Sequence, residues 1–110
     1  MAAAPAISPP IDRVFHALGD PSRRAIVERL ARGPLSVSRL AEPLGITVTA
    51  VGQHLRLLES CGLVASEKHG RTRVCRIEAA GLITIAQWIA HCRELWETRL
   101  DRLGDVLGEE

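Results

Sequence analysis

The residues best suited to recognise another molecule lie on one face of a helix that the sequence predicts over residues 48–61. Val51, Leu55 and Leu58 recur at helical spacing and are expected to face the core. The opposite side mixes polar and methyl-bearing side chains and carries no acid: Val48, Thr49, Gly52, Gln53 and Arg56. In the major groove of B-DNA, glutamine pairs with adenine, arginine pairs with guanine, and methyl groups contact thymine. We therefore interpret this face as a DNA-reading surface, with an ordinary solvated helix as the alternative.

Thr47 and His54 complete the predicted surface. Thr47 directly precedes the helix, where its side chain can cap the free N–H groups. The positive end of the helix dipole at this point favours a phosphate. His54 lies beside Leu55, where it suits a hydrogen bond within the protein as well as a contact with DNA.

A second basic segment follows this helix. Residues 63–68 and 72–77 are short segments that lean towards β-branched residues, and Gly70 lies between them, which predicts a β-hairpin. Its tip carries Lys68, His69, Arg71 and Arg73. Cations on a protruding hairpin reach phosphates or the minor groove. The alternative is that they protect an exposed sheet edge from pairing.

The elements around the predicted surface are short helices with recognisable ends. Helices are expected over residues 11–18, from Asp20-Pro21 to Gly33-Pro34, from the cap Ser36 to Gly45, and from the cap Thr47 to Gly62. The last two are joined by three or four residues that include a glycine, which is the layout of a helix-turn-helix. The expected fold class is mainly α with a β-hairpin wing, a winged helix-turn-helix.

A long helix over residues 79–107 predicts a dimer. Its apolar residues step by three or four: Leu82, Ile85, Ile89, Cys92, Trp96, Leu100, Leu103 and Leu107. This stripe has more apolar surface than a small domain can cover, and a second copy of the same helix would cover it. The helix over residues 11–18 is expected to supply the other half of the interface. The predicted interface residues are Phe15, Ile85, Ile89, Cys92, Trp96 and Leu103.

The bulk properties fit one domain. The chain has 110 residues and a net charge of +1, and three cysteines suit reduced thiols. We expect a disordered segment over residues 1–10 and one domain over residues 11–107. No signal peptide or membrane span is recognisable, so a cytoplasmic location without a membrane partner is expected. Residues 53–77 carry five Lys and Arg against two Glu, whereas residues 94–110 carry two against six acids, which suits a protein that turns one face towards phosphates.

Several motifs in order resemble the ArsR/SmtB repressors. They are ALGDPSRRAIVERL, LSVSRLAEPLGIT, VGQHLRLLESCGLV and the wing segment GRTRV. The resemblance covers roughly residues 12–103. It implies a winged-helix homodimer that binds a palindromic operator in double-stranded DNA and releases it when a small inducer arrives. It also implies that residues 47–56 form the recognition segment.

Many members of this family sense metals, and the residues here do not match their sites. Ser36 and Ser38 occupy the positions of the cysteines of one familiar site, and a hydroxyl cannot replace a thiolate for a soft metal. A second familiar site lies on the terminal helix. There His91 and Glu94 have suitable spacing, but the early ligands are missing. We therefore expect no metal and no cofactor, with His91 and Glu94 as an incomplete alternative site.

The sequence leaves a thiol response as an alternative signal and a protein-contact module as an alternative function. Cys61, Cys75 and Cys92 have no CxC or CxxC spacing, so a redox or arsenite response is an alternative without a motif behind it. A winged-helix module for protein contacts is the main rival function. An enzyme is not expected, because no nucleophile arrangement or phosphate-binding glycine loop is present.

Overall fold

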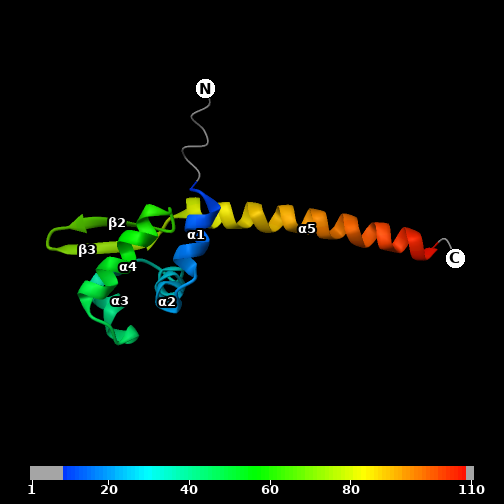
Figure 1. Ribbon diagram of the computed structural model, residues 1–110. Helices are drawn as coiled ribbons and strands as arrows, with labels where there is room; N and C mark the ends of the chain where they lie inside the picture. Colours follow the sequence, from blue (N-terminus) through cyan, green and yellow to red (C-terminus); the bar gives the residue numbers. More distant parts are fainter. Residues whose placement is uncertain (1–8, 109–110) are drawn as a thin grey trace, which may run out of the picture.

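The computed structural model describes residues 9–108 and consists of a winged helix-turn-helix body from which one long helix extends (Figure 1). The elements in chain order are α1 (Ile11–Leu18), α2 (Pro21–Leu30), β1 (Leu35–Ser36), α3 (Val37–Leu44), α4 (Val48–Ser60), β2 (Val64–His69), β3 (Thr72–Ile77) and α5 (Ala79–Gly108). The predicted fold class is confirmed.

The junction between α1 and α2 is held by residues of the DPSRR segment. Asp20 caps α2, accepting a hydrogen bond from the Arg23 backbone N–H at 3.0 Å. That bond lowers the pKa of the Asp20 carboxyl below its ordinary value. The Arg23 side chain points the other way, and its Nε donates to the Ala17 carbonyl at 2.6 Å. Arg24 Nη1 donates to the Leu18 carbonyl at 2.6 Å, so both arginines satisfy free carbonyls at the end of α1.

The helix-turn-helix is built from two capped helices and a tight turn. Ser36 caps α3 and Thr47 caps α4, each accepting a hydrogen bond from the backbone N–H three residues on. Gly45 ends α3 with φ 66°, a left-handed conformation that glycine adopts without strain. The turn therefore occupies residues 45–47, as the spacing predicted.

A three-stranded antiparallel sheet contains the predicted hairpin and one strand that was not predicted. The strand order is β1-β3-β2, and Gly70 forms the hairpin turn with φ 63°. In the added strand β1, Leu35 pairs with Cys75 and Ser36 with Val74. A strand of two residues is too short to show alternation in the sequence.

The core lies between the helices of the body and the sheet. Its largest fully buried side chains are Val14, Ile26, Leu40, Val51, Leu58, Cys61, Leu63 and Cys75. Val51, Leu55 and Leu58 are all buried, which confirms the predicted core face of α4.

The helix α5 begins against the body and ends far from it (Figure 1). Its Gly81 N–H donates to the Gly62 carbonyl at 2.7 Å, and an added Cβ at Gly81 would lie 2.9 Å from Leu63. Further along, Trp88 meets Phe15 of α1 edge to face at 5.1 Å between ring centroids. Within residues 9–108, every helix is too short or too polar to cross a bilayer.

The segment predicted to be disordered, residues 1–10, lies mostly outside the described residues. Pro9 and Pro10 are described. Pro10 occupies the N-cap position of α1, and the Pro9 carbonyl accepts a hydrogen bond from Thr84 Oγ1 of α5 at 3.4 Å.

Candidate DNA-binding surface

The exposed side of α4 carries the residues predicted to read DNA. Thr49, Gln53 and Arg56 are exposed on the side away from the buried Val51 and Leu55. Val48, at the start of the helix, has 53% of its surface exposed. Thr47 is exposed, and its hydroxyl is already engaged in capping, with a distance of 3.0 Å from Oγ1 to the Ala50 nitrogen. The surface is therefore available to a groove and contains no acidic side chain.

Gly52 lies beside this surface and leaves space over the helix backbone. A Cβ built at Gly52 would meet no heavy atom within 4 Å. Glycine is unfavourable inside a helix, by about 0.5–1 kcal/mol relative to alanine. The packing of this chain therefore does not require a glycine here.

His54 is placed on the side of α4 that faces α2. The residue is half-buried, and its Nδ1 lies 3.4 Å from Arg23 Nη1. Arg23 is the residue that also binds the carbonyls at the end of α1. The structure thus gives His54 a contact within the protein, one of the two roles that its position allowed.

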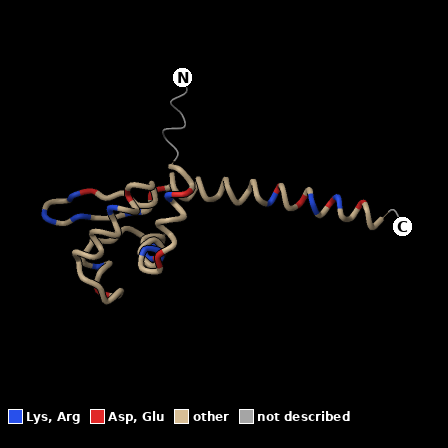
Figure 2. Tube along the Cα trace, viewed as in Figure 1, with Lys and Arg blue, Asp and Glu red and all other residues tan. Residues whose placement is uncertain are grey.

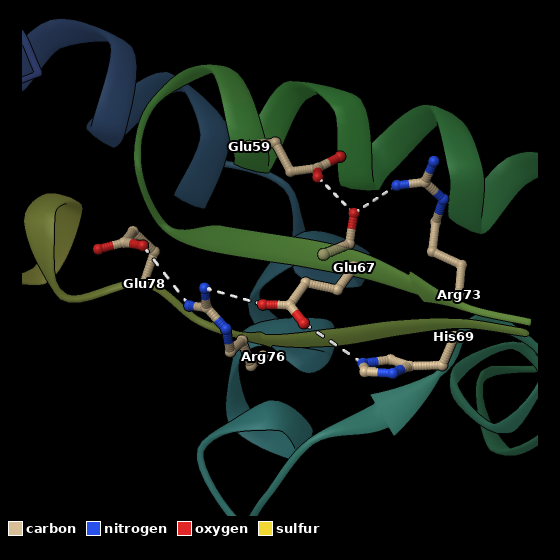
Figure 3. A network of polar contacts seen from close by, with 7 residues as sticks. Glu59, Glu67, His69, Arg73, Arg76 and Glu78 are labelled. Carbon is tan, nitrogen blue, oxygen red and sulfur yellow. Dashed lines mark hydrogen bonds and ion pairs between the residues drawn. The ribbon is translucent and has the colours of Figure 1, made fainter.

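The wing carries cations on both faces of its hairpin, and several of them form ion pairs or hydrogen bonds with neighbouring side chains (Figure 3). On one face, Glu67 lies 3.3 Å from His69 Nε2 and 3.9 Å from Arg76 Nη2. On the other face, Ser66 Oγ donates to Glu59 Oε1 at 2.7 Å and accepts from Arg73 Nη1 at 2.6 Å.

Two cations near the tip of the wing, unlike those just described, are outside these ion pairs and hydrogen bonds. Lys68 and Arg71 are exposed, and within the described chain neither forms an ion pair. Figure 2 shows Lys and Arg along the hairpin, whereas acids and bases alternate on the distal part of α5. The wing is therefore the more basic end of the molecule.

The predicted interface residues lie along α1 and α5. Phe15, Ile89, Trp96 and Leu103 are exposed, with Trp96 at 61%. Cys92 is half-buried, and Ile85 packs partly against the core of its own chain. Cys92, Leu95, Trp96 and neighbouring residues of α5 line an open hollow of about 500 Å³. The distal part of α5 therefore presents a long apolar surface to solvent in the single chain.

The cysteines differ in exposure. Cys61 and Cys75 are buried, and burial raises the pKa of both thiols above their ordinary value. A buried thiol with a raised pKa forms little thiolate at neutral pH and reacts slowly.

The residues considered for metal binding lie at the surface. His91 and Glu94 are both exposed on α5. Among residues 9–108, no three His, Cys, Asp or Glu side chains of one chain lie close enough to hold a metal ion together.

Sequence reasoning missed the residues that join elements to one another. Arg23 links α1, α2 and α4, and Ser66 links α4 to the wing. The signal for Arg23 is its place in the DPSRR segment, directly after a helix end. No comparable signal marks Ser66, because its partners are set by how β2 lies against α4.

Comparisons with known proteins agree with this architecture. A helix-turn-helix domain profile matches residues 18–67. The chain is 46% identical over 74 residues to the HTH-type transcriptional regulator Rv2034 of Mycobacterium tuberculosis, covering 67% of this chain and 69% of that protein. It is 45% identical over 60 residues to the regulator NmtR of the same organism, covering 54% of this chain and spanning only half of that relative.

Solved structures give the same result. An ArsR-like transcriptional regulator from Rhodococcus sp. RHA1 superimposes with a TM-score of 0.78 at 33% identity, over 91% of this chain and 92% of that chain. The ArsR family regulator RHA00566 has a TM-score of 0.74 at 41% identity, over 78% and 94%. The homodimeric winged helix-turn-helix DNA-binding domain Mb0332 of Mycobacterium bovis has a TM-score of 0.62 at 31% identity, over 74% and 78%.

Proposed function

The chain belongs to the ArsR family of helix-turn-helix transcriptional regulators, and we propose that it is a homodimeric repressor. Two copies of α4 would occupy successive major grooves of a palindromic operator, and an inducing signal would release them. As a member of this family it is a DNA-binding regulator and not an enzyme.

The observation that carries the proposal is the exposed, acid-free face of α4. Thr49, Gln53 and Arg56 extend from a helix whose other side is anchored in the core. A rigid helix of this kind fits the major groove, where glutamine and arginine form bidentate pairs with bases. Thr47 and Val48 at the start of α4 would lie near the phosphates and the methyl groups of thymine.

The wing would supply contacts to the DNA backbone. Lys68 and Arg71 are the exposed cations near its tip that form no ion pair within the described residues. Such contacts add affinity and fix the orientation of the protein on the duplex without reading its sequence.

A dimer is supported by the apolar surface of α5. Leu95, Trp96, Leu100 and Leu103 are each 47–61% exposed in the single chain. Several large apolar side chains exposed along one helix are typical of an interaction site. Phe15, which meets Trp88, extends the surface onto α1. A twofold pair would present two α4 helices to half-sites about 34 Å apart, one turn of B-DNA.

Titration of operator DNA tests the proposal. Fluorescence anisotropy with fragments from upstream of the gene should find one tight site, and footprinting should show a protected palindrome. The affinity should fall steeply with salt, because each neutralised phosphate contributes a slope of about −0.9 in log K against log salt. A flat salt dependence together with no protected palindrome would refute DNA binding at this surface.

Alanine variants test whether the exposed face of α4 is the surface that contacts DNA. Replacing Gln53 or Arg56 with alanine should cost about 1–3 kcal/mol on the specific site. Arg32→Ala is the matched control, because it also removes an exposed arginine but at a site outside the proposed DNA-reading face. Arg32 follows α2 and lines a hollow with Arg76 and Leu82. Deleting the gene should raise transcription of its target if the protein is a repressor, whereas a fall would identify an activator.

A further inference from the structure

We propose that Glu59, Ser66 and Arg73 form a positioning set that fixes the wing relative to the recognition helix, and that Arg73 raises DNA affinity through this role without contacting a phosphate. The inference rests on the proposed DNA binding, since it concerns how the two DNA-facing elements are held together. It assigns a role to three residues that the DNA-reading surface does not use.

The geometry places one hydroxyl between two opposite charges (Figure 3). Ser66 Oγ donates its proton to Glu59 Oε1 at 2.7 Å and accepts from Arg73 Nη1 at 2.6 Å. Glu59 lies in the last turn of α4, Ser66 on β2 and Arg73 on β3. Hydrogen bonds to ionised groups are shorter and stronger than those between neutral groups. A single side chain thus ties the recognition helix to both strands of the wing.

The strand register shows why these residues meet. Ser66 pairs with Cys75, and Lys68 with Arg73. Because alternate residues of a strand face the same side, Ser66, Arg73 and the buried Cys75 all lie on the face that packs against α4. Burial raises the pKa of the Cys75 thiol, and the charges of Glu59 and Arg73 act on it in opposite directions, so both ions lie near this buried position.

The short connection between α4 and the wing shows which movement the Ser66 hydrogen bonds restrict, namely a change in the angle of the hairpin relative to α4. Only Cys61, Gly62 and Leu63 join α4 to β2, and Gly62 has φ 75°. The base of the hairpin is anchored by the buried Cys61 and Leu63 and by the pairing of β1 with β3, and the two strands extend from this base towards the tip. The contact at Ser66 lies beyond this turn and holds the hairpin at one angle.

Arg73 and Arg71 lie on the same hairpin but differ in their contacts within the protein. The Arg73 guanidinium donates to Ser66 Oγ, whereas Arg71 lies in the hairpin turn, and no ion pair of the described chain includes Arg71. A cation that neutralises a phosphate changes the salt dependence of binding, and one that only orients the wing does not. Salt dependence therefore separates the two roles.

The test compares three alanine variants by anisotropy on the operator over a range of salt concentrations. Ser66→Ala and Arg73→Ala should each weaken binding by about 5- to 10-fold, the effect of losing one or two hydrogen bonds, with an unchanged salt slope. Arg71→Ala, the matched control on the same hairpin, should reduce the slope by about one. Ser66→Thr, which keeps the hydroxyl, should restore binding to within about twofold of the original protein.

Hydrogen exchange provides a readout that does not depend on DNA. Amides of residues 64–77 should exchange faster in Ser66→Ala than in the original chain and stay unchanged in Arg71→Ala. Glu59→Ala, which removes the acceptor of the Ser66 hydroxyl, serves as the second variant should Ser66→Ala unfold. The double variant Ser66→Ala/Arg73→Ala should lose no more affinity than Ser66→Ala alone, because Ser66→Ala already removes both hydrogen bonds of the set.

These measurements distinguish failure of the proposed DNA binding from failure of the positioning role. If the original protein shows no salt-dependent binding, the proposed function fails. If it binds but Arg73→Ala lowers the salt slope by about one and Ser66→Ala binds normally, Arg73 is a phosphate contact and the positioning role is wrong. Unchanged hydrogen exchange of residues 64–77 in Ser66→Ala, or in Glu59→Ala if Ser66→Ala unfolds, would also overturn it.

Discussion

Replacing Gly52 with alanine should move the stability of the protein and its affinity for DNA in opposite directions. Gly52 lies within α4, between residues whose side chains are proposed to enter the major groove. A methyl group at this position meets nothing in the protein, but it would occupy space between the helix and a bound duplex. The two effects can be measured separately.

The magnitude of the stability change follows from the environment of Gly52. An added Cβ has no heavy atom within 4 Å, so no steric cost offsets the gain in helix propensity. Alanine is better than glycine inside a helix by about 0.5–1 kcal/mol. For a domain of this size, that gain should raise the Tm by about 2–8 °C.

The change in affinity should have the other sign. A well-packed contact accommodates an extra methyl group only by shifting, at a cost of about 1–3 kcal/mol. Affinity should therefore fall by at least about fivefold. Differential scanning fluorimetry at fixed protein concentration and anisotropy on the operator measure the two quantities. Fixed concentration matters because the Tm of a dimer depends on it.

A second glycine provides the matched control. At Gly81 on α5, an added Cβ would lie 2.9 Å from the Gly62 carbonyl oxygen and from Leu63. The clash should outweigh the propensity gain, so Gly81→Ala should lower the Tm. If Gly52→Ala lowers the Tm, the space above α4 is not open. If it leaves affinity unchanged, this part of α4 does not approach DNA.

Three further predictions concern a cap, the thiols and the dimer. Because the folded-state pKa of Asp20 is lowered from 3.8, its stabilising effect should be complete above that pH and lost as pH falls through the lowered value. The Tm of the original protein should thus fall more steeply between about pH 5 and pH 2 than that of Asp20→Asn, whose amide caps without titrating. A maleimide at neutral pH should label Cys92 first, since burial raises the pKa of Cys61 and Cys75, and equal labelling of all three in the folded protein would contradict this. Trp96→Ala should shift the protein towards monomer in light scattering while its circular dichroism stays helical, and an unchanged mass at low micromolar concentration would remove Trp96 from the interface.

The sequence predicted the features that depend on neighbouring residues. Ser36 and Thr47 cap their helices as expected, and Gly45 and Gly70 adopt the left-handed conformations of the predicted turns. Each of these depends on hydrogen bonds or torsions within a few residues. The core face of α4 was also predictable, because burial on one side of a helix repeats every three or four residues.

The residues that could not be predicted depend on contacts between elements. His54 is 31 residues from Arg23 in the chain, and their contact exists only because α2 packs against α4. Ser66 gives no sequence signal, since a serine in a strand is common. Its role follows from the register of β2 with β3 and from the position of Glu59 on α4. Sequence patterns give the faces of elements but not which faces meet.

Arg23 connects α1, which is proposed to contribute to the dimer interface, with α4, which is proposed to read DNA. Its Nε and Nη2 donate to the Ala17 and His16 carbonyls at the end of α1, and its Nη1 lies 3.4 Å from His54 of α4. On the same helix α1, Phe15 packs against Trp88 of α5. One planar guanidinium serves both partners, so a rotation of α1 relative to α2 is expected to change the geometry of these contacts. We therefore expect a displacement of α5 that turns α1 to change the contact between Arg23 and His54, which lies one residue from Gln53 on α4.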